Sequence, residues 1–138
     1  MKLLMIYTKK FSYTPTKKTL DENFEKHEQS QSFENCIVGF IQVEEEDEEK
    51  KTLKVEKNLA KNLKWAARKN DTQRIILHSF AHLSESKASP EYSKEILNLA
   101  EERLRNAEYE TAQTPFGYFL DLNISAPGFS QARMFKSF

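Results

Sequence analysis

A chain of 138 residues is long enough to bury one hydrophobic core, and a hydrophobic fraction of 38 % with 12 % aromatic residues excludes an intrinsically disordered protein. The 21 Lys and Arg residues are balanced by 21 Asp and Glu residues. This balance excludes a protein that holds nucleic acid by bulk charge, so any RNA contact must be local.

Cysteine content and terminal sequence indicate a reducing compartment. Cys36 is the only cysteine, which excludes an internal disulfide. It lies in the apolar run Cys36–Phe40, so we interpret it as a core residue and not as a nucleophile. The apolar start Met1–Ile6 is too short for a signal peptide or a membrane span. We therefore expect a cytoplasmic protein without a membrane partner.

The first part of the chain predicts two short strands and a long loop. An apolar run predicts a buried strand at Lys2–Thr8. Alternation predicts a second strand at Phe11–Thr14, after a tight reversal and ended by Pro15. The polar stretch Thr16–Asn35 predicts a loop with one short helix around Glu22–Glu28.

The middle of the chain alternates strand and helix patterns. Cys36–Val43 is almost continuously apolar, which predicts a strand covered on both faces. The acidic run Glu44–Glu49 predicts a solvated loop, and apolar residues at helical spacing predict an amphipathic helix over Lys50–Lys69. A short strand at Arg74–Ser79 follows.

The last part predicts one more helix and a closing pair of strands. Ser89-Pro90 has the residue types favoured at the N-cap and first turn of a helix. Strands are predicted at Tyr109–Gln113 and Tyr118–Ser125 with a turn between them, and Pro127-Gly128 ends the last strand before a short tail.

The order β-β-β-α-β-α-β-β defines the expected fold class. Its central β-α-β unit predicts a parallel pair, Ile37–Val43 beside Ile75–Ser79, joined by a right-handed crossover. The flanking hairpins predict antiparallel edges. We therefore expect an α/β (α+β) fold, with residues 1–138 as a single domain that has a mixed sheet and two main helices.

Two predicted strand ends are candidate binding positions, because ligands bind beyond the carboxyl ends of parallel strands in open α/β sheets. One is Val43-Glu44. The other is the segment Ser79–Ser84, which carries His82 just after a buried strand. A neutral imidazole there can donate to or accept from a substrate; a structural histidine that caps the loop is the alternative.

We expect neither a metal ion nor a cofactor. His78 and His82 are four residues apart, but a zinc site needs a third ligand, and the two are predicted on a strand and in a loop. The sequence also has no glycine-rich phosphate loop and no nucleophile elbow.

The segment Thr114–Phe119 places a Pro-Phe-Gly turn before a strand. A purely structural role explains it, because proline and glycine form the turn and phenylalanine fills the core. The alternative is that its aromatic rings seat an adenine by stacking.

In order and spacing, two of these motifs resemble the editing domain of archaeal-type threonyl-tRNA synthetases. Phe80–Ser84 reads Phe-Ala-His-Leu-Ser, and Thr114–Tyr118 corresponds to the Ala-Pro-Phe-Gly-Tyr run of that family. The opening strand, Ile37–Glu44 and Ile124–Gly128 match in character and order. The resemblance covers nearly the whole chain and is loosest over residues 15–35.

This resemblance implies a D-aminoacyl-tRNA deacylase-like fold, usually a homodimer, that hydrolyses serine from mischarged threonine tRNA. His82 matches the family histidine that lines the seryl pocket, and we predict it as the catalytic residue. On the same basis the predicted substrate-binding residues are Tyr7, Thr8, Val43, Glu44, Ala81, Pro115, Phe116, Gly117, Tyr118, Phe119 and Leu120.

The chain departs from the family at three polar positions. The family has Tyr-Lys directly after Pro-Phe-Gly-Tyr, whereas this chain has Phe119-Leu120 and so lacks the lysine that helps to position the attacking water. Phe129 stands where the family has a histidine. Arg133, counted without gaps, stands where it has a glutamate.

Two functions of different classes remain open, so the sequence leaves undecided whether the chain is an enzyme. One is a free-standing, trans-editing deacylase that acts on the aminoacylated 3′ end of tRNA. The other is a catalytically degenerate module that binds aminoacyl-tRNA or a synthetase, such as a threonyl-tRNA synthetase without its own editing domain. The chain is too short to hold the ATP-using core of a synthetase.

Overall fold

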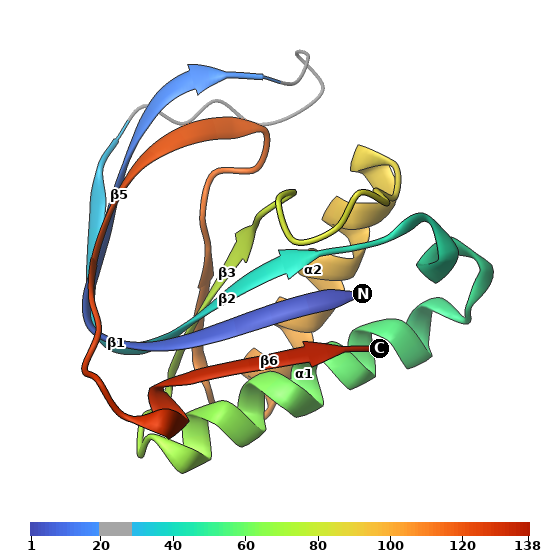
Figure 1. The fold of residues 1–138 in the computed structure, drawn as a ribbon. Coiled ribbons are helices and arrows are strands. Elements are labelled where there is room, and N and C mark those ends of the chain that lie inside the picture. Colours follow the sequence, from blue (N-terminus) through green and yellow to red (C-terminus); the bar gives the residue numbers. More distant parts are fainter. Residues whose placement is uncertain (20–28) are drawn as a thin grey trace.

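The structure, a computed structural model, describes residues 1–19 and 29–138. Two long helices cover one face of a strongly curved sheet (Figure 1). In chain order the elements are β1 (Lys2–Lys18), β2 (Gln31–Gln42), the 3₁₀ helix η1 (Glu45–Glu49), α1 (Thr52–Lys69), β3 (Arg74–Ser79), α2 (Pro90–Asn106), β4 (Glu110–Gln113), β5 (Tyr118–Ser125), the 3₁₀ helix η2 (Ser130–Ala132) and β6 (Arg133–Ser137).

The sheet is mixed, as the sequence predicts. Its strand order is β4-β3-β2-β1-β5, and β6 also pairs with β1. The predicted parallel pair is confirmed, with Ile37 opposite Ile75 and Ile41 opposite Ser79, and β4 extends the parallel part beside β3. The pairs that involve β1 are antiparallel. The α/β (α+β) class with two main helices is therefore confirmed.

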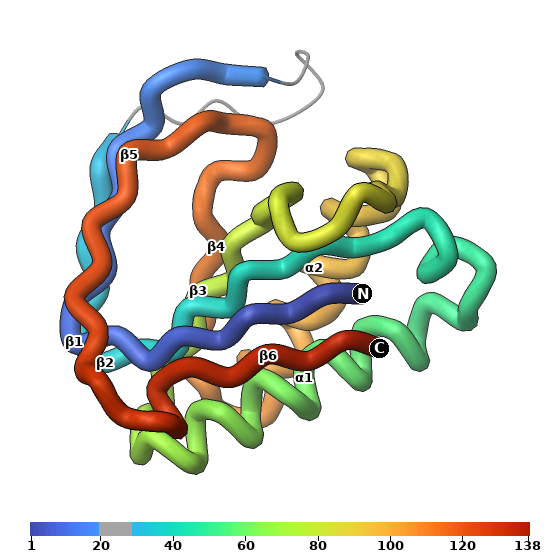
Figure 2. Tube along the Cα trace, in the orientation of Figure 1, coloured from blue at the N-terminus to red at the C-terminus, as the bar shows by residue number. Residues whose placement is uncertain are grey.

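The predicted break of the first strand is wrong. Residues 2–18 form the single strand β1, which passes from beside β6 to beside β5 (Figure 2). Pairing with β2 ends at Tyr13, so among the described residues β5 is the only strand partner of Pro15, whose missing N–H disrupts no second ladder there. A register shift follows between Pro15 and Lys17. The predicted loop therefore contains the ends of β1 and β2, and the predicted helix at Glu22–Glu28 lies outside the described residues.

The predicted closing hairpin is also wrong. β4 and β5 lie at opposite ends of the strand order, so the Thr114–Gly117 segment crosses between them and is not a hairpin turn. The predicted tail holds β6, in which Met134 pairs with Met5. A run of only five residues with two basic side chains gives a weak strand pattern, and β6 forms because β1 presents a free edge to it.

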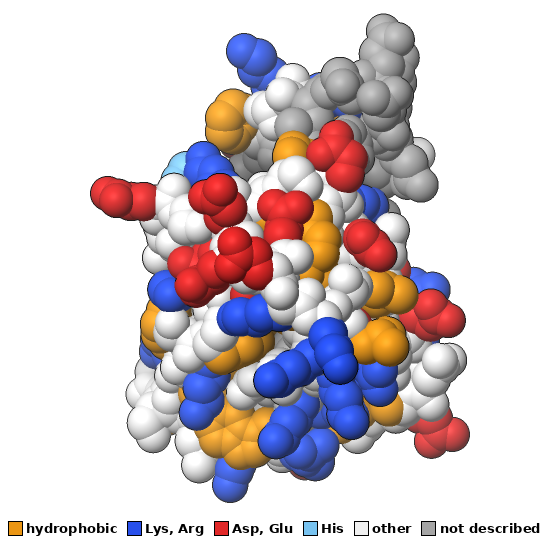
Figure 3. Space-filling view, turned by 90° about the vertical axis from the view of Figure 1, so that its right-hand side faces the viewer, with side chains coloured by type: hydrophobic (Ala, Val, Ile, Leu, Met, Phe, Trp, Pro, Cys, Tyr) orange, Lys and Arg blue, Asp and Glu red, His pale blue; other side chains and the backbone are white. Residues whose placement is uncertain are grey.

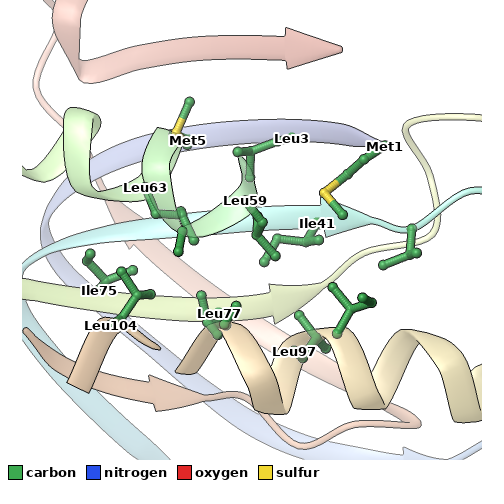
Figure 4. Close-up of a cluster of buried hydrophobic side chains, with 14 of the residues drawn as sticks. Met1, Leu3, Met5, Ile41, Leu59, Leu63, Ile75, Leu77, Leu97 and Leu104 are labelled. Atoms are coloured by element: carbon green, nitrogen blue, oxygen red, sulfur yellow. The ribbon is translucent and has the colours of Figure 1, made fainter. Parts of the chain in front are cut away.

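Apolar side chains alternate between the two faces of the sheet. Ile37 and Ile41 of β2 face the helices, whereas Cys36, Val38 and Phe40 face the inside of the curved sheet. From Cys36 onward both faces of β2 are buried, as predicted, and Cys36 is a core residue. Figure 4 shows the helix-side core, where Leu59 and Leu63 of α1 and Leu97 and Leu104 of α2 meet the strands.

The helices follow their predicted patterns. Ser89 caps α2 by accepting from the Tyr92 N–H at 3.2 Å, and Pro90 is its first residue. Within the described ranges, no helix combines the length and apolarity needed to cross a membrane.

The predicted solvated acidic loop is wrong at two positions. Glu44 and Asp47 are buried, at 5 % and 1 % exposure. Their carboxylates hold the Met1 ammonium at 2.7 and 3.1 Å, and Met1 and Phe138 lie side by side, joined by backbone hydrogen bonds (Figure 2). Opposite charges from two distant segments make this burial tolerable, which a local charge count does not reveal.

Candidate functional site

A pocket of about 530 Å³ opens at the carboxyl ends of β2 and β3. Its walls are the loop after β3, the first turn of α2, and the segment that leads from β4 into β5. It lies where parallel strands end, as the topology predicts. Nine of the twelve predicted site residues line it: Val43, Ala81, His82, Pro115, Phe116, Gly117, Tyr118, Phe119 and Leu120.

The other three predicted site residues do not line this pocket. Tyr7 and Thr8 pair with Ile37 and Cys36, at the opposite end of the buried part of β2. The Thr8 hydroxyl lies 3.1 Å from the Cys36 thiol, and the Tyr7 hydroxyl donates to Asn35. Because β1 continues to Lys18, no strand end brings Tyr7 and Thr8 to the pocket. Glu44 points instead to the Met1 ammonium and Ser84.

Gln42, which the sequence analysis missed, holds the loop that carries His82. Its Oε1 accepts from the N–H groups of Leu83 and Ser84 at 2.6 and 2.8 Å. Its Nε2 donates to the carbonyls of Ser84 and Ser86 at 2.7 and 2.9 Å. Gln42 is 2 % exposed, so all four bonds form away from bulk water. A polar residue inside an otherwise apolar strand was the available signal.

Backbone bonds extend this attachment along the whole loop. The Phe80 N–H donates to the Ile41 carbonyl at 2.9 Å, and the Ala88 N–H donates to the Val43 carbonyl at 3.0 Å. Glu44 adds a bond from the Ser84 hydroxyl at 2.7 Å. The loop therefore continues the β2–β3 pairing beyond the end of β3 and is positioned by the sheet.

His82 lies at the exposed mouth of the pocket and His78 lies at its buried floor. The ring of Phe80 stands between them, with centroid distances of 5.0 Å to His82 and 5.7 Å to His78. Phe40 packs edge-on against both Phe80 and His78 at 5.1 Å. The aromatic row fixes the positions of both imidazoles. His78 is thus a second site residue, at a position that the sequence predicts within a strand.

The segment opposite His82 is apolar and rigidly placed. Gly117 adopts a left-handed conformation with φ of 79°, which favours glycine. Phe116 is buried beneath the Lys94 ammonium, which lies 5.7 Å from the ring centroid. Leu120 and Leu122 pack on the apolar cluster inside the sheet and also line the pocket. A ligand here meets an apolar wall on one side and imidazoles on the other.

Two of the three departures from the family lie outside the pocket. Phe129 is exposed and packs against Tyr7 at a centroid distance of 6.5 Å. Arg133 donates to the Pro127 carbonyl at 3.1 Å. The remaining departure, Phe119-Leu120, lies in the pocket lining itself.

The charged groups of the pocket are few. Among the described residues that line it, Lys87 is the only lysine or arginine and there is no carboxylate. Across residues 1–19 and 29–138, no three His, Cys, Asp or Glu side chains come together in a way that could hold a metal ion. The pocket can therefore offer hydrogen bonds from imidazole and backbone groups, one cation at its edge, and apolar surface.

The fold is D-aminoacyl-tRNA deacylase-like. The structure is similar to that of the c-Myc DNA Unwinding Element Binding Protein, with a TM-score of 0.71 and 13 % sequence identity over 99 % of this chain and 98 % of that one. Residues 1–138 match the model of the archaea-specific editing domain of threonyl-tRNA synthetase, and the chain belongs to this family.

Curated relatives are full-length ligases. The threonine–tRNA ligase of Staphylothermus marinus is 34 % identical over 140 residues, which cover 99 % of this chain and 22 % of that protein. The ligase of Thermofilum pendens is 32 % identical over 130 residues, 93 % of this chain and 21 % of that protein. The chain thus spans about a fifth of the length of these relatives.

Proposed function

We propose that this domain hydrolyses the ester bond of mischarged aminoacyl-tRNA, with seryl-tRNA(Thr) as the substrate. The observation that carries the proposal is that the Phe80–His82 segment and the Pro115–Tyr118 turn line opposite sides of one pocket. These segments come from distant parts of a chain that belongs to an editing-domain family. Both are also the segments on which the sequence analysis placed the substrate.

The physical need for such a second site is clear. Serine lacks one methyl group of threonine, so the aminoacylation site of a synthetase can favour threonine over serine by only about 1–3 kcal/mol of binding free energy. A site that admits the smaller amino acid and destroys its ester can remove the remaining errors. Here the amino acid enters between His82 and the apolar wall, and the terminal adenine lies against aromatic surface.

The chemistry requires little from side chains. The aminoacyl ester is reactive, and the vicinal hydroxyl of the terminal ribose can assist an attacking water. His82 lies at the mouth and hydrogen-bonds the substrate in this proposal, while backbone groups of the loop orient the ester. Leu120 supplies no charge to orient water, and loss of one such stabiliser costs about 10²–10³ in rate. We therefore expect slow turnover.

The test is time-resolved release of serine from seryl-tRNA(Thr) and of threonine from threonyl-tRNA(Thr). Wild type should release serine, His82→Ala should lose most of this activity, and Leu120→Lys should raise it. Glu102→Gln, at an exposed position on α2 outside the pocket, is the control and should match wild type. Rapid release that His82→Ala leaves unchanged would place the reaction elsewhere.

A catalytically degenerate binding module is the second candidate. It is favoured by the pocket lining, in which an apolar Leu120 and a carboxylate-free wall leave no evident group to activate water. Retained binding of seryl-tRNA without release of serine by any variant would support this candidate over the first.

The exposed face of α1 is the part of the surface that we propose holds the tRNA backbone. Its cations recur every three or four residues, at Lys54, Lys57, Lys61, Lys64 and Arg68, and so form one stripe. None of the five has an ion-pair partner within residues 1–19 and 29–138. Figure 3 shows Lys and Arg side chains gathered in the lower part of the face, at the level of α1, with Asp and Glu side chains above. An electroneutral chain can thus present a local basic surface.

We also propose a homodimer and a role in trans. β5 has β1 as its only partner within the described residues, and Phe119 and Ile124 on it are 58 % and 41 % exposed. Such an edge is commonly covered by a second copy. Sedimentation should show twice the 16.2 kDa chain mass, and a lone monomer at micromolar concentration would contradict the dimer. Added to a threonyl-tRNA synthetase that lacks an editing domain, the protein should lower seryl-tRNA(Thr) accumulation.

A further inference from the structure

The floor of the pocket is built around one buried imidazole. His78 shares a face of β3 with Ile76, which belongs to the apolar cluster inside the curved sheet. It is 6 % exposed, and its ring stands edge-on to Phe40 at 90°. Polar side chains in such surroundings cost free energy unless they are hydrogen-bonded, so both ring nitrogens need partners.

One nitrogen has its partner inside the protein. The Nδ1 atom of His78 lies 2.8 Å from the Thr114 hydroxyl, which is itself buried at 5 % exposure. Thr114 is held there because its N–H donates to the Leu77 carbonyl at 2.9 Å, continuing the β3–β4 ladder by one residue. Thr114 is therefore a positioning residue that fixes the plane of the imidazole.

The other nitrogen opens into the pocket. Nε2 of His78 makes no hydrogen bond to any described residue. Among the described residues, Asn70 Oδ1 is the only fully buried side-chain polar atom without a hydrogen-bond partner. Because Nε2 of His78 also lacks a partner but is not such an atom, it must be accessible to solvent. His78 lines the pocket, which is the open space beside it. A hydrogen-bonding atom therefore faces the cavity and has no partner among the described residues.

The ring is neutral at physiological pH, because burial lowers the pKa of His78 to about 4. A neutral imidazole has one donor and one acceptor nitrogen, and the Thr114 hydroxyl can bond to either form of Nδ1. Nε2 can thus donate to or accept from a hydroxyl group. A weak base of this kind is suited to recognition more than to proton abstraction.

The aminoacyl group is the extreme end of a charged tRNA, so it reaches the floor of the pocket while the nucleotides remain nearer the mouth. We propose that Nε2 of His78 hydrogen-bonds the side-chain hydroxyl of the bound aminoacyl group and so selects a seryl over an alanyl ester. This inference rests on the proposed deacylase function and names a specificity-determining residue within the same site. A bound alanyl group would cover Nε2 without pairing it, which lowers the affinity of the alanyl ester by about tenfold.

The test measures binding with amides of serine and alanine to 3′-amino-3′-deoxyadenosine, which mimic the aminoacyl-tRNA end and resist hydrolysis. Calorimetry on wild type should give about tenfold tighter binding of the seryl amide. His78→Phe, which keeps an aromatic ring and removes both ring nitrogens, should bind the two amides equally. Thr111→Val removes a buried β4 hydroxyl outside the pocket and should retain the wild-type preference.

A spectroscopic measurement keeps the test independent of variant folding. The ¹⁵N resonance of His78 Nε2 in wild type should shift with the seryl amide and stay in place with the alanyl amide. Seryl binding that leaves this resonance unmoved, or an unchanged preference in folded His78→Phe, would overturn the assignment while the proposed function stands. Failure of wild type to bind either amide or to release serine would overturn the proposed function, and this inference with it.

Discussion

Gln42 bonds Ser84 through both ends of its side-chain amide: Nε2 donates to the Ser84 carbonyl at 2.7 Å, and Oε1 accepts from the Ser84 N–H at 2.8 Å. The pair joins the end of a central strand to the loop that carries His82. The position of the pocket wall therefore depends on a residue in the body of the sheet.

We expect Gln42→Leu to lower the free energy of unfolding by about 1–3 kcal/mol, because it leaves buried N–H and C=O groups of the loop without hydrogen-bond partners. Urea denaturation followed by circular dichroism measures this change. The control is Gln131→Leu, at an exposed position whose side chain makes no hydrogen bond to any described residue, and it should be neutral. Equal stability of both variants would show that the hydrogen bonds of the Gln42 side chain do not stabilise the loop.

Stability should fall as the pH drops from about 6.5 to about 4. Burial lowers the pKa of His78 from 6.5 to about 4, so in this window the unfolded chain binds a proton that the folded chain does not. The free energy of unfolding therefore keeps its full value above pH 6.5 and has fallen by about 3 kcal/mol once both states are protonated. Urea unfolding between pH 7 and pH 4 should show a shallower decline for His78→Phe than for wild type or Thr111→Val. Identical slopes would contradict the buried neutral imidazole.

The ion pair between Glu56 and Arg103 joins a buried carboxylate to a partly exposed guanidinium, so the loss of the arginine should be costly. Glu56 is 2 % exposed and accepts from Nε and Nη2 of Arg103 at 2.6–3.1 Å, whereas the arginine side chain is 39 % exposed. Arg103→Met should lower the midpoint of thermal unfolding, because it leaves a buried carboxylate unpaired, and adding Glu56→Leu should restore it.

Arg105→Met is the matched control for that pair. It breaks the pair with Glu101 on the same helix and the hydrogen bonds to the Thr111 carbonyl, but it leaves no fully buried carboxylate unpaired, so it should lower the midpoint less than Arg103→Met does. An Arg103→Met variant as stable as Arg105→Met would mean that water reaches Glu56.

The basic stripe of α1 should govern the salt dependence of tRNA binding. Lys57→Gln with Lys61→Gln should weaken binding and lower the slope of log K against log salt by about 2, since each lost phosphate contact removes about 0.9. Lys9→Gln with Lys10→Gln removes two exposed lysines of β1 and should leave the slope unchanged. Fluorescence anisotropy with labelled tRNA at several salt concentrations measures both. An equal effect of the two pairs would indicate nonspecific attraction.

Much of the fold was predictable because it depends on neighbours in the chain. β3 and β5 have their predicted bounds, and Ser89 caps α2 through a hydrogen bond to a residue three positions away. Alternation, helical spacing and capping act over a few residues, so the sequence displays them directly. The two motifs that form the pocket wall were visible for the same reason.

Tertiary structure alone decided the pairings and burials that join distant segments. β1 runs through Pro15 because, within the described ranges, β5 is its only strand partner there, and β5 lies more than a hundred residues later in the chain. Glu44 and Asp47 can be buried because the Met1 ammonium pairs with them. Gln42 can be buried because its side-chain amide is hydrogen-bonded to the loop after β3. The imidazole of His78 likewise has its hydrogen-bond partner, the Thr114 hydroxyl, on a distant segment of the chain. In each case the stabilising partner is remote in sequence, and no local pattern identifies it.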